Sequence, residues 1–347
     1  MEVEATAGDA DRPLLGPNSP NRGLDHLAGA STIGQGSGSV PYKGIRTRPF
    51  IQRVAIFVLV VVAMLGPLIA AIANETFESY IFAGAALSTV SCCLVALSYR
   101  LLPAWRAHPN PLIYGRTLAE LLLALRFLLV DDDQFRGGEG EDSCRWVAGW
   151  TQLGLFSAEA WLLVLALDLA LSLTNPFTSD NRNLRLFSFL AWGSGIISAW
   201  VLVASPGAYG MSAIDICWIR GGLFSGWGWA LFYGWMVTAF GVATIVFVHA
   251  ALRLRSGLPE TMLSRRRALV RMEKTLGCLA LYWTLLLVLA IGFMLVPGQH
   301  SHWAAEPGSW VQKTLGYCLA AKGAVVSVIW FGVNPTGEFV RALLCMG

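Results

Sequence analysis

Charged side chains interrupt several long apolar stretches of this sequence, and these are the residues whose positions suggest chemistry. Six of them lie inside such stretches: Arg116, Glu120, Arg126, Glu159, Asp168 and Lys322. Each charge placed in a lipid bilayer costs at least about 2.5–3.5 kcal/mol on insertion scales unless it is paired or faces water. We therefore expect the six side chains to face the interior of a helix bundle and to bind one another or a ligand.

Three of these charges fall at the middle of their apolar stretches when each helix is counted at about 1.5 Å per residue. They are Glu120, Glu159 and Lys322, and we predict that they form one buried cluster. The functional interpretation is a polar ligand site or a switch, in which protonation or ligand binding breaks the Lys322 pairing. The alternative is a static salt bridge that fixes the register of the helices.

The remaining charges lie nearer the two membrane surfaces. Arg116 and Asp168 have matching depth on the cytoplasmic side, so we expect them to pair and to link two helices. Arg126 lies toward the outside, where an anionic ligand would meet it first. Asp131 and Asp132, which follow it closely, offer the alternative of simple neutralisation.

The composition is that of an integral membrane protein. Of the 347 residues, 55% are hydrophobic and 14% are charged, whereas soluble domains carry about 25% charged residues. The net charge of +3 is small and the basic residues lie in short links between apolar stretches, so we expect no nucleic-acid partner. The histidines and carboxylates form no arrangement that predicts a catalytic pocket or a metal site. We expect neither an enzyme nor a cofactor.

Eight apolar stretches approach the length of about 20 residues that a bilayer core requires. They are 54–73, 80–102, 111–130, 146–174, 186–206, 223–252, 275–296 and 310–333. Links rich in arginine and lysine precede the first stretch and join the second to the third, the fourth to the fifth, and the sixth to the seventh. Because positive links favour the cytoplasmic side, all four are predicted to lie there, together with both chain termini.

The expected fold is therefore an all-α, polytopic membrane protein, in which a seven-helix bundle follows one further transmembrane helix. Low apolar content predicts a disordered tail at the N-terminus, and an apolar stripe after the last stretch predicts a short amphipathic helix on the inner membrane surface. The expected segments are a cytoplasmic tail at 1–48, the extra helix at 49–74, the seven-helix domain at 80–333 and the second tail at 334–347.

Two of the seven cysteines fall outside the apolar stretches and on the outer side. They are Cys144 and Cys217, whereas the others lie within the stretches or at the cytoplasmic end: Cys92, Cys93, Cys278, Cys318 and Cys345. Disulfides persist in an oxidising compartment such as the cell exterior. We predict a disulfide between Cys144 and Cys217 that joins an outer loop to the head of a helix.

The last seven stretches, with an outer start, an inner end and an arginine-rich link between the fifth and the sixth, have the topology of a G-protein-coupled receptor. The tract Cys217-Trp218-Ile219, the later Leu231-Phe232-Tyr233-Gly234, and Ala160-Trp161 with the helix that follows resemble the cAMP-receptor-like, or class E, receptors. The resemblance covers about 80–333. The preceding helix is similar to that of the receptor half of receptor–phosphatidylinositol-phosphate-kinase fusions.

This resemblance implies a plasma-membrane receptor that senses an extracellular ligand of unknown identity and activates a heterotrimeric G protein. We expect the G-protein contact in the arginine-rich link, at Arg265, Arg266, Arg267 and Arg271. Anchoring to anionic membrane lipid, worth about 1 kcal/mol per basic residue, explains the same charges. One alternative to a receptor is a secondary transporter or channel that relays ions through the intramembrane charges, and another is a membrane scaffold that does not signal.

Overall fold

The computed structural model describes residues 77–132, 141–174, 180–212, 216–220, 225–255, 266–295, 310–334 and 339. All of them belong to one unit, Arg46–Gly347. The predicted tail at 1–48, the predicted helix at 49–74 and the end of the chain with Cys345 lie outside the described residues.

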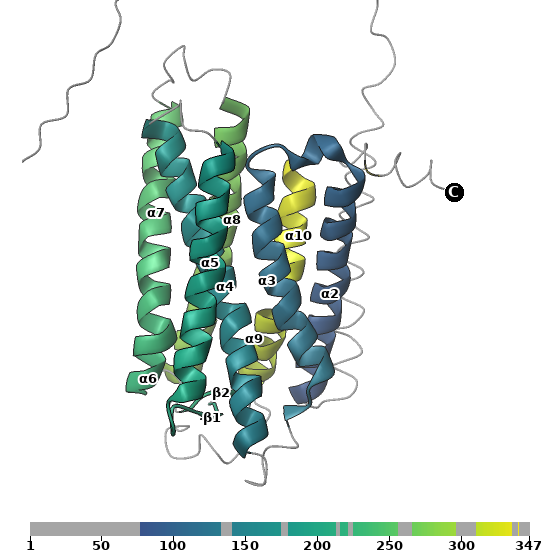
Figure 1. Ribbon diagram of the computed structural model, residues 1–347, viewed down its shortest axis with the longest axis vertical. Coiled ribbons are helices and arrows are strands. Elements are labelled where there is room, and N and C mark those ends of the chain that lie inside the picture. The colour runs from purple at the N-terminus through teal and green to yellow at the C-terminus, as the bar shows by residue number, and fades with distance from the viewer. Residues whose placement is uncertain are drawn as a thin grey trace, which may run out of the picture. The chain divides into compact units, whose positions relative to one another are not determined.

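Helices make up most of the described chain and run side by side in one bundle (Figure 1). In chain order they are α2 (Phe77–Leu101), α3 (Asn110–Leu129), α4 (Glu141–Thr174), α5 (Asp180–Ala204), α6 (Gly226–Gly228), α7 (Gly234–Arg255), α8 (Arg266–Leu295), α9 (Trp310–Ala320) and α10 (Lys322–Val333). A 3-10 turn, Pro103–Arg106, lies between α2 and α3. A π-helical turn, Trp229–Tyr233, joins α6 to α7. Helices thus occupy each of the seven expected ranges from 80–102 to 310–333.

Proline and glycine define several helix ends. Pro103 lies two residues after the end of α2 at Leu101, and a proline disfavours helical geometry in the residue before it. Pro206 and Gly207 follow α5, where Gly207 adopts a positive φ of 80° and the Ala208 amide donates to the Ser205 carbonyl at 3.1 Å. Such a turn requires glycine at its third position, so the sequence places the chain reversal there.

Within the part of the chain that the structure describes, four helices are long and apolar enough to cross a membrane: Glu78–Leu101, Asp142–Thr174, Asn183–Ala204 and Gly226–Arg253. The pair α9 and α10, bent by 48°, makes a fifth if it is counted as one span. Helix α3 is not among them, because Arg116, Glu120 and Arg126 interrupt it.

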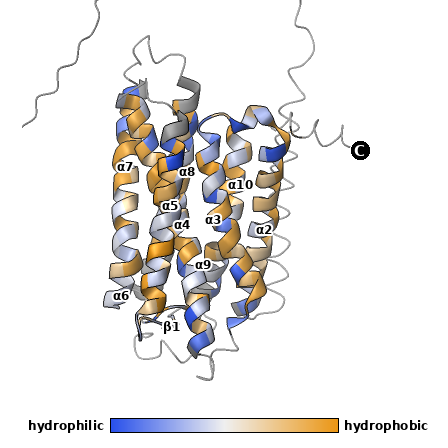
Figure 2. Cartoon of the chain, in the orientation of Figure 1, coloured by the Kyte–Doolittle hydropathy of each residue, from blue (hydrophilic) through white to orange (hydrophobic). Residues whose placement is uncertain are grey.

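Hydrophobic residues are frequent along α5 and α7 (Figure 2), and several of their large apolar side chains are exposed. On α5, Phe189, Ile197 and Trp200 are 74, 65 and 69% exposed. Large apolar surfaces of this kind mark contact with a membrane or with another protein. Four exposed tryptophans lie at one end of the bundle, where α4 begins, α5 ends and α6 begins: Trp146, Trp200, Trp227 and Trp229. Such a group resembles the aromatic belt at a membrane surface.

Helix α4 is the central element and packs against α3, α5, α7, α8 and the strand β2 (Cys217–Ile219). Small residues allow close approach at the α3 interface. A Cβ on Gly115 would lie 2.5 Å from the Trp161 ring, and one on Gly154 would lie 3.0 Å from Leu123 Cβ. On the other side of the bundle, α2 packs against α3, α9 and α10.

A short hairpin is the one departure from the all-α prediction within the described residues. Strand β1 (Tyr209–Met211) pairs antiparallel with β2, and Gly210 lies opposite Trp218. The hairpin turns inward: Ile216, Cys217, Trp218 and Ile219 are all buried. It therefore closes one end of the bundle with side chains from the loop between α5 and α6.

Candidate functional site

The predicted central cluster forms, and Arg116 joins it as a fourth member. Lys322 Nζ lies 2.7 Å from Glu159 Oε1 and 3.5 Å from Glu120 Oε1. Arg116 Nη2 lies 3.4 Å from Glu159 Oε1 and 3.3 Å from Glu120 Oε1. None of the four residues is more than 3% exposed. Two positive and two negative charges thus share one buried site, where each compensates the cost of burying its neighbours.

Three elements position this ionic cluster of Arg116, Glu120, Glu159 and Lys322. Helix α3 places Arg116 and Glu120 one turn apart, and α4 supplies Glu159 beside the Ala158 carbonyl, which accepts a hydrogen bond from Arg116 at 2.9 Å. Lys322 is the first residue of α10. A cation at a helix N-terminus is opposed by the helix dipole, so the two glutamates stabilise a lysine where the helix itself disfavours one.

The expected pair of Arg116 with Asp168 is wrong. Asp168 Oδ2 lies 2.8 Å from His108 Nε2, just before the start of α3, while Arg116 binds the two glutamates. The error comes from counting depth from the helix ends. Helix α4 has 34 residues and α3 has 20, so α4 extends past α3 and Asp168 lies level with the link that precedes α3.

The cluster retains hydrogen-bonding capacity but little space. Glu120 Oε2 and Arg116 Nε are buried and bind no partner among the described residues. A cavity of about 10 Å³ adjoins Arg116 and Trp161, which is room for one water molecule. Among the described residues, this cavity is too small for a ligand larger than a water molecule.

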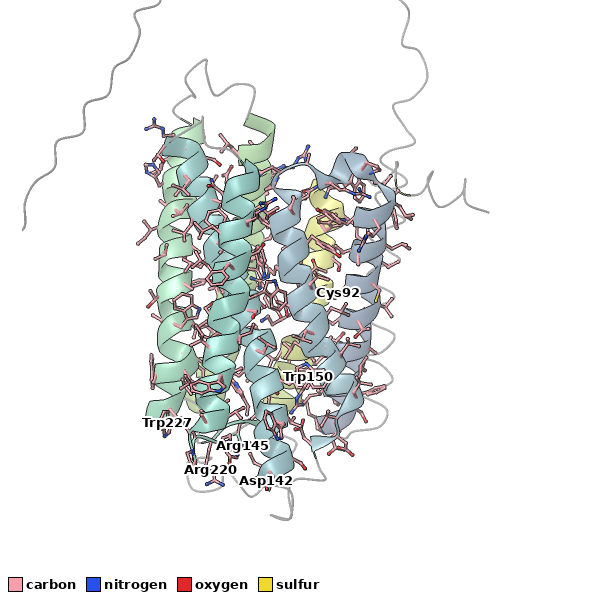
Figure 3. The ribbon with its side chains drawn as sticks, in the orientation of Figure 1. Cys92, Asp142, Arg145, Trp150, Arg220 and Trp227 are labelled. Atoms are coloured by element: carbon pink, nitrogen blue, oxygen red, sulfur yellow. A yellow bond between two sulfur atoms is a disulfide. The ribbon has the colours of Figure 1, made fainter. Side chains whose placement is uncertain are left out.

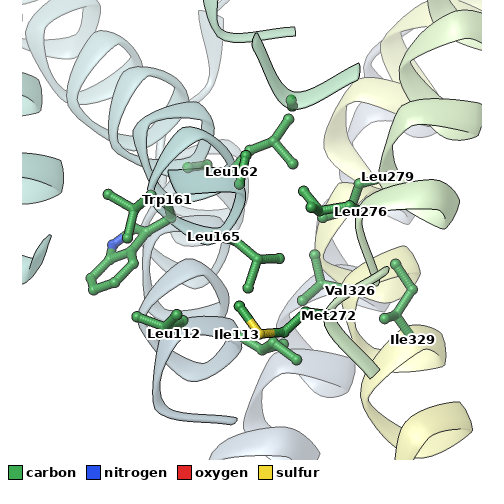
Figure 4. Close-up of a cluster of buried hydrophobic side chains, with 14 of the residues drawn as sticks. Leu112, Ile113, Trp161, Leu162, Leu165, Met272, Leu276, Leu279, Val326 and Ile329 are labelled. Carbon is green, nitrogen blue, oxygen red and sulfur yellow. The ribbon is translucent and has the colours of Figure 1, made fainter. Parts of the chain in front are cut away.

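Apolar side chains fill the bundle between the ionic cluster and the end opposite the hairpin, and Figure 4 shows part of this packing. They come from four helices and include Leu112, Ile113, Leu165, Met272, Leu276, Leu279, Val326 and Ile329. At the far end of this apolar seam, Asn110 Nδ2 donates to Asn334 Oδ1 at 2.9 Å, which ties the start of α3 to the end of α10. The half of the bundle opposite the hairpin is therefore closed by packing of α8 against α3, α4 and α10.

The predicted disulfide between Cys144 and Cys217 is confirmed, with Cα atoms 5.5 Å apart. It joins the head of α4 to β2 at the hairpin end of the bundle. Arg145, next to Cys144, donates from Nε to the Val203 carbonyl at 2.7 Å and so ties the same end of α4 to α5 (Figure 3). The loop between α5 and α6 is thus held covalently and by hydrogen bonds.

Arg126 is neutralised, which was the second of its two predicted roles. Its guanidinium donates two hydrogen bonds to the Asp132 carboxylate, at 2.5 and 2.6 Å, and one to the Cys217 carbonyl at 3.3 Å. Asp132 Oδ1 accepts from the Cys217 amide at 2.9 Å. Because Arg126 is fully buried, it serves here to clamp β2 onto α3 rather than to meet a ligand from outside.

Helices thus occupy the seven predicted spans, a disulfide joins the loop after α5 to the head of the third span, and an apolar seam closes the opposite half of the bundle. The family model for the seven-transmembrane receptors of the secretin family matches residues 74–317. The chain belongs to this family. A search of curated proteins found no match. The prediction of a seven-transmembrane receptor is therefore supported. The finer resemblance to cAMP-receptor-like receptors and to kinase fusions is not confirmed.

Sequence reasoning missed one residue of this secretin-family receptor that the structure makes prominent. Gln152 on α4 is fully buried and binds Trp218, Ser198 and the Leu231 carbonyl. A single amide inside an apolar stretch was the available signal, since a buried amide requires partners. Its partners lie 46 to 79 residues away in sequence, so no local pattern identifies them.

Most of the residues predicted to contact a G protein lie outside the described part of the chain. Arg265 and the side chains of Arg266 and Arg267 fall outside the described residues, and Arg271 lies in the second turn of α8. No group of three or more potential metal ligands occurs among the residues that the structure describes.

Proposed function

We propose that this secretin-family member is a cell-surface receptor that senses an extracellular ligand and activates a heterotrimeric G protein. The family match over residues 74–317 is the observation that carries the proposal. The proposal includes the eight-span topology, the plasma-membrane location and the cytoplasmic position of both termini. In this proposal the hairpin end of the bundle faces outward and is the side on which the ligand binds.

The arrangement of the bundle suggests how a signal crosses it. The ionic cluster joins α3, α4 and α10, and the apolar seam beneath it holds α8 against the same three helices. A ligand that binds better to a state with α8 moved outward shifts the population toward that state by its difference in affinity. The cytoplasmic cleft opened in this way exposes Arg271 and, in the proposal, the preceding Arg265, Arg266 and Arg267 to a G protein.

Transport is the alternative that the same intramembrane charges raise. Within the ionic cluster, however, each positive group already contacts both carboxylates, so the cluster is internally balanced. A relay requires a group that exchanges its partner for an ion or a proton during each cycle. The receptor function is therefore the better supported of the two.

Guanine-nucleotide exchange on a panel of G-protein α subunits tests the proposal, using the full chain reconstituted in lipid. The informative variant is Arg265→Ala/Arg266→Ala/Arg267→Ala, and the matched control is Arg182→Ala/Arg185→Ala in a different basic link. We expect receptor-dependent exchange that the first variant lowers and the control leaves intact. Absence of exchange on every subunit, together with ion-gradient-dependent uptake, would favour transport instead.

A further inference from the structure

The side chain of Trp218 occupies a slot at the hairpin end that has the chemistry of a ligand site. Trp218 is 5% exposed, and its indole Nε1 donates to Gln152 Oε1 at 2.7 Å. Its ring meets the Phe232 ring edge-on at 4.8 Å and the Tyr233 ring at 6.2 Å between centroids. Ligand sites typically combine aromatic walls with one or a few polar groups that fix orientation.

The polar group of this slot connects three helices. Gln152 on α4 donates from Nε2 to Ser198 Oγ on α5 at 2.7 Å and to the Leu231 carbonyl at 2.9 Å. Leu231 belongs to the π-helical turn before α7, and single π-helical turns occur frequently at functional sites. The donor that occupies Gln152 Oε1 therefore determines how the amide is oriented toward α5 and α7.

The contacts that anchor the hairpin are made by Cys217, the residue before Trp218. Cys217 carries the disulfide to Cys144, donates its amide to Asp132, and accepts at its carbonyl from Arg126 and Thr151. The Trp218 side chain has one hydrogen bond, to Gln152, and the residue opposite it on β1 is Gly210, which has no side chain. The indole can consequently leave the slot while the backbone anchor at Cys217 stays in place.

We propose that Trp218 fills the receptor's outer binding site from within, and that the external ligand is a flat, uncharged aromatic compound with one N–H donor that replaces the indole on Gln152. The acceptor Oε1 requires a donor, and the rings of Phe232 and Tyr233 require a flat apolar partner. The ligand needs no charge, because the nearby charged residues Arg126 and Asp132 already neutralise each other. The role of this ligand in signalling rests on the proposed receptor function, whereas the slot itself does not.

If the Trp218 side chain occupies the slot, it competes with any external ligand and lowers the apparent affinity of that ligand. A tethered group competes at an effective concentration on the order of millimolar, and the apparent affinity of a ligand falls by the fraction of protein in the open state. Removal of the Trp218 ring therefore raises the affinity for an indole-like compound. We expect an increase of about 10–100-fold, which corresponds to an open fraction of roughly 1–10%.

The experiment uses the full chain in lipid nanodiscs and 5-fluoroindole as the probe, followed by fluorine NMR. The variants are Trp218→Gly and Gln152→Leu, each compared with the wild type, and 5-fluoro-1-methylindole is the matched probe without a donor. We expect tight binding to Trp218→Gly, weaker binding to the wild type, and loss of both with Gln152→Leu or with the methylated probe. Formation of the disulfide and the melting temperature show whether each variant is folded.

A second variant keeps the proposal testable if Trp218→Gly does not fold. Trp218→Phe retains an aromatic ring but loses the bond to Gln152, so its ring leaves the slot more readily and the probe binds more tightly than to the wild type. Trp218 is a static core residue, and the proposal is overturned, if the wild type shows no Gln152-dependent binding at the solubility limit of the probe. Equal binding of the two probes overturns it as well. Because no G protein is present, a failure here is separate from a failure of nucleotide exchange.

Discussion

At the scale of single residues, the ionic cluster shows why a buried charge is informative only together with its partners. Lys322 contacts both Glu120 and Glu159, and its removal leaves a net negative charge in the bundle. We expect Lys322→Met to lower the free energy of unfolding by about 3–5 kcal/mol, as when one partner of a buried pair is removed. Equilibrium unfolding in detergent micelles measures this effect.

Two comparisons give that prediction its controls. The double variant Lys322→Met/Glu159→Gln restores charge balance with Arg116 and Glu120, so we expect it to recover much of the lost stability. Lys313→Met removes another lysine, which lies over the Tyr80 ring at 5.7 Å, and such a contact contributes only about 0.5–1 kcal/mol at an exposed site. Equal losses for Lys322→Met and Lys313→Met would contradict the buried-pair account.

Arg126 and Asp132 give a second prediction at this scale, because they distinguish a structural clamp from a ligand contact. If the pair serves only to hold Cys217, Arg126→Gln and Asp132→Asn each leave the other charge unpaired and cost about 3–5 kcal/mol. The free energy of unfolding of the two variants therefore falls by similar amounts. A ligand contact at Arg126 predicts instead that Arg126→Gln weakens ligand binding at unchanged stability.

At the scale of elements, close helix packing depends on a few glycines. A Cβ on Gly84 of α2 would lie 2.7 Å from the Tyr317 carbonyl oxygen and 3.0 Å from Ala320 Cβ on α9. Since a backbone atom cannot turn aside as a side chain can, Gly84→Ala must separate the two helices. We expect a loss of about 1–3 kcal/mol in unfolding free energy, typical of overpacking.

The matched control for this prediction is Gly241→Ala on α7, where a Cβ meets nothing within 4 Å. Alanine is favoured over glycine in a helix by about 0.8–1 kcal/mol, so we expect this substitution to leave stability unchanged or to raise it. Thermal unfolding of the two variants side by side is sufficient. A loss in both would mean that glycine is needed for flexibility and not for packing.

The helices were predictable from the sequence, and the pairings of their side chains only in part. Long apolar stretches predict helices because the backbone must satisfy its own hydrogen bonds in lipid. The cost of a buried charge likewise predicted that Glu120, Glu159 and Lys322 meet. Relative helix lengths and offsets are set by tertiary packing, so Arg116 was paired with Asp168 instead of the glutamates. The hairpin and the break at Ala321 were missed for the same reason.

At the scale of the whole molecule, the two ends of the bundle are built differently. The hairpin end combines the disulfide with the clamp of Arg126 and Asp132 on Cys217, whereas the other half is filled by the apolar seam. Covalent and ionic contacts restrict motion more than apolar packing does. We expect a receptor built in this way to move at the seam and to keep the hairpin backbone at Cys217 fixed, provided that the hairpin faces outward.

Sidedness is therefore the prediction on which the receptor interpretation depends, and two exposed positions test it. Pro206 lies in the turn before the hairpin, and Ala107 lies between the 3-10 turn and α3. On intact cells, a membrane-impermeant maleimide should label Pro206→Cys, whereas Ala107→Cys should react only after permeabilisation. Replacing the exposed Cys93 and Cys278, together with Cys345 near the end of the chain, by serine removes background labelling. The reverse pattern would place the arginine-rich link outside the cell, where no G protein can reach it, because the two ends of the bundle cannot exchange sides independently.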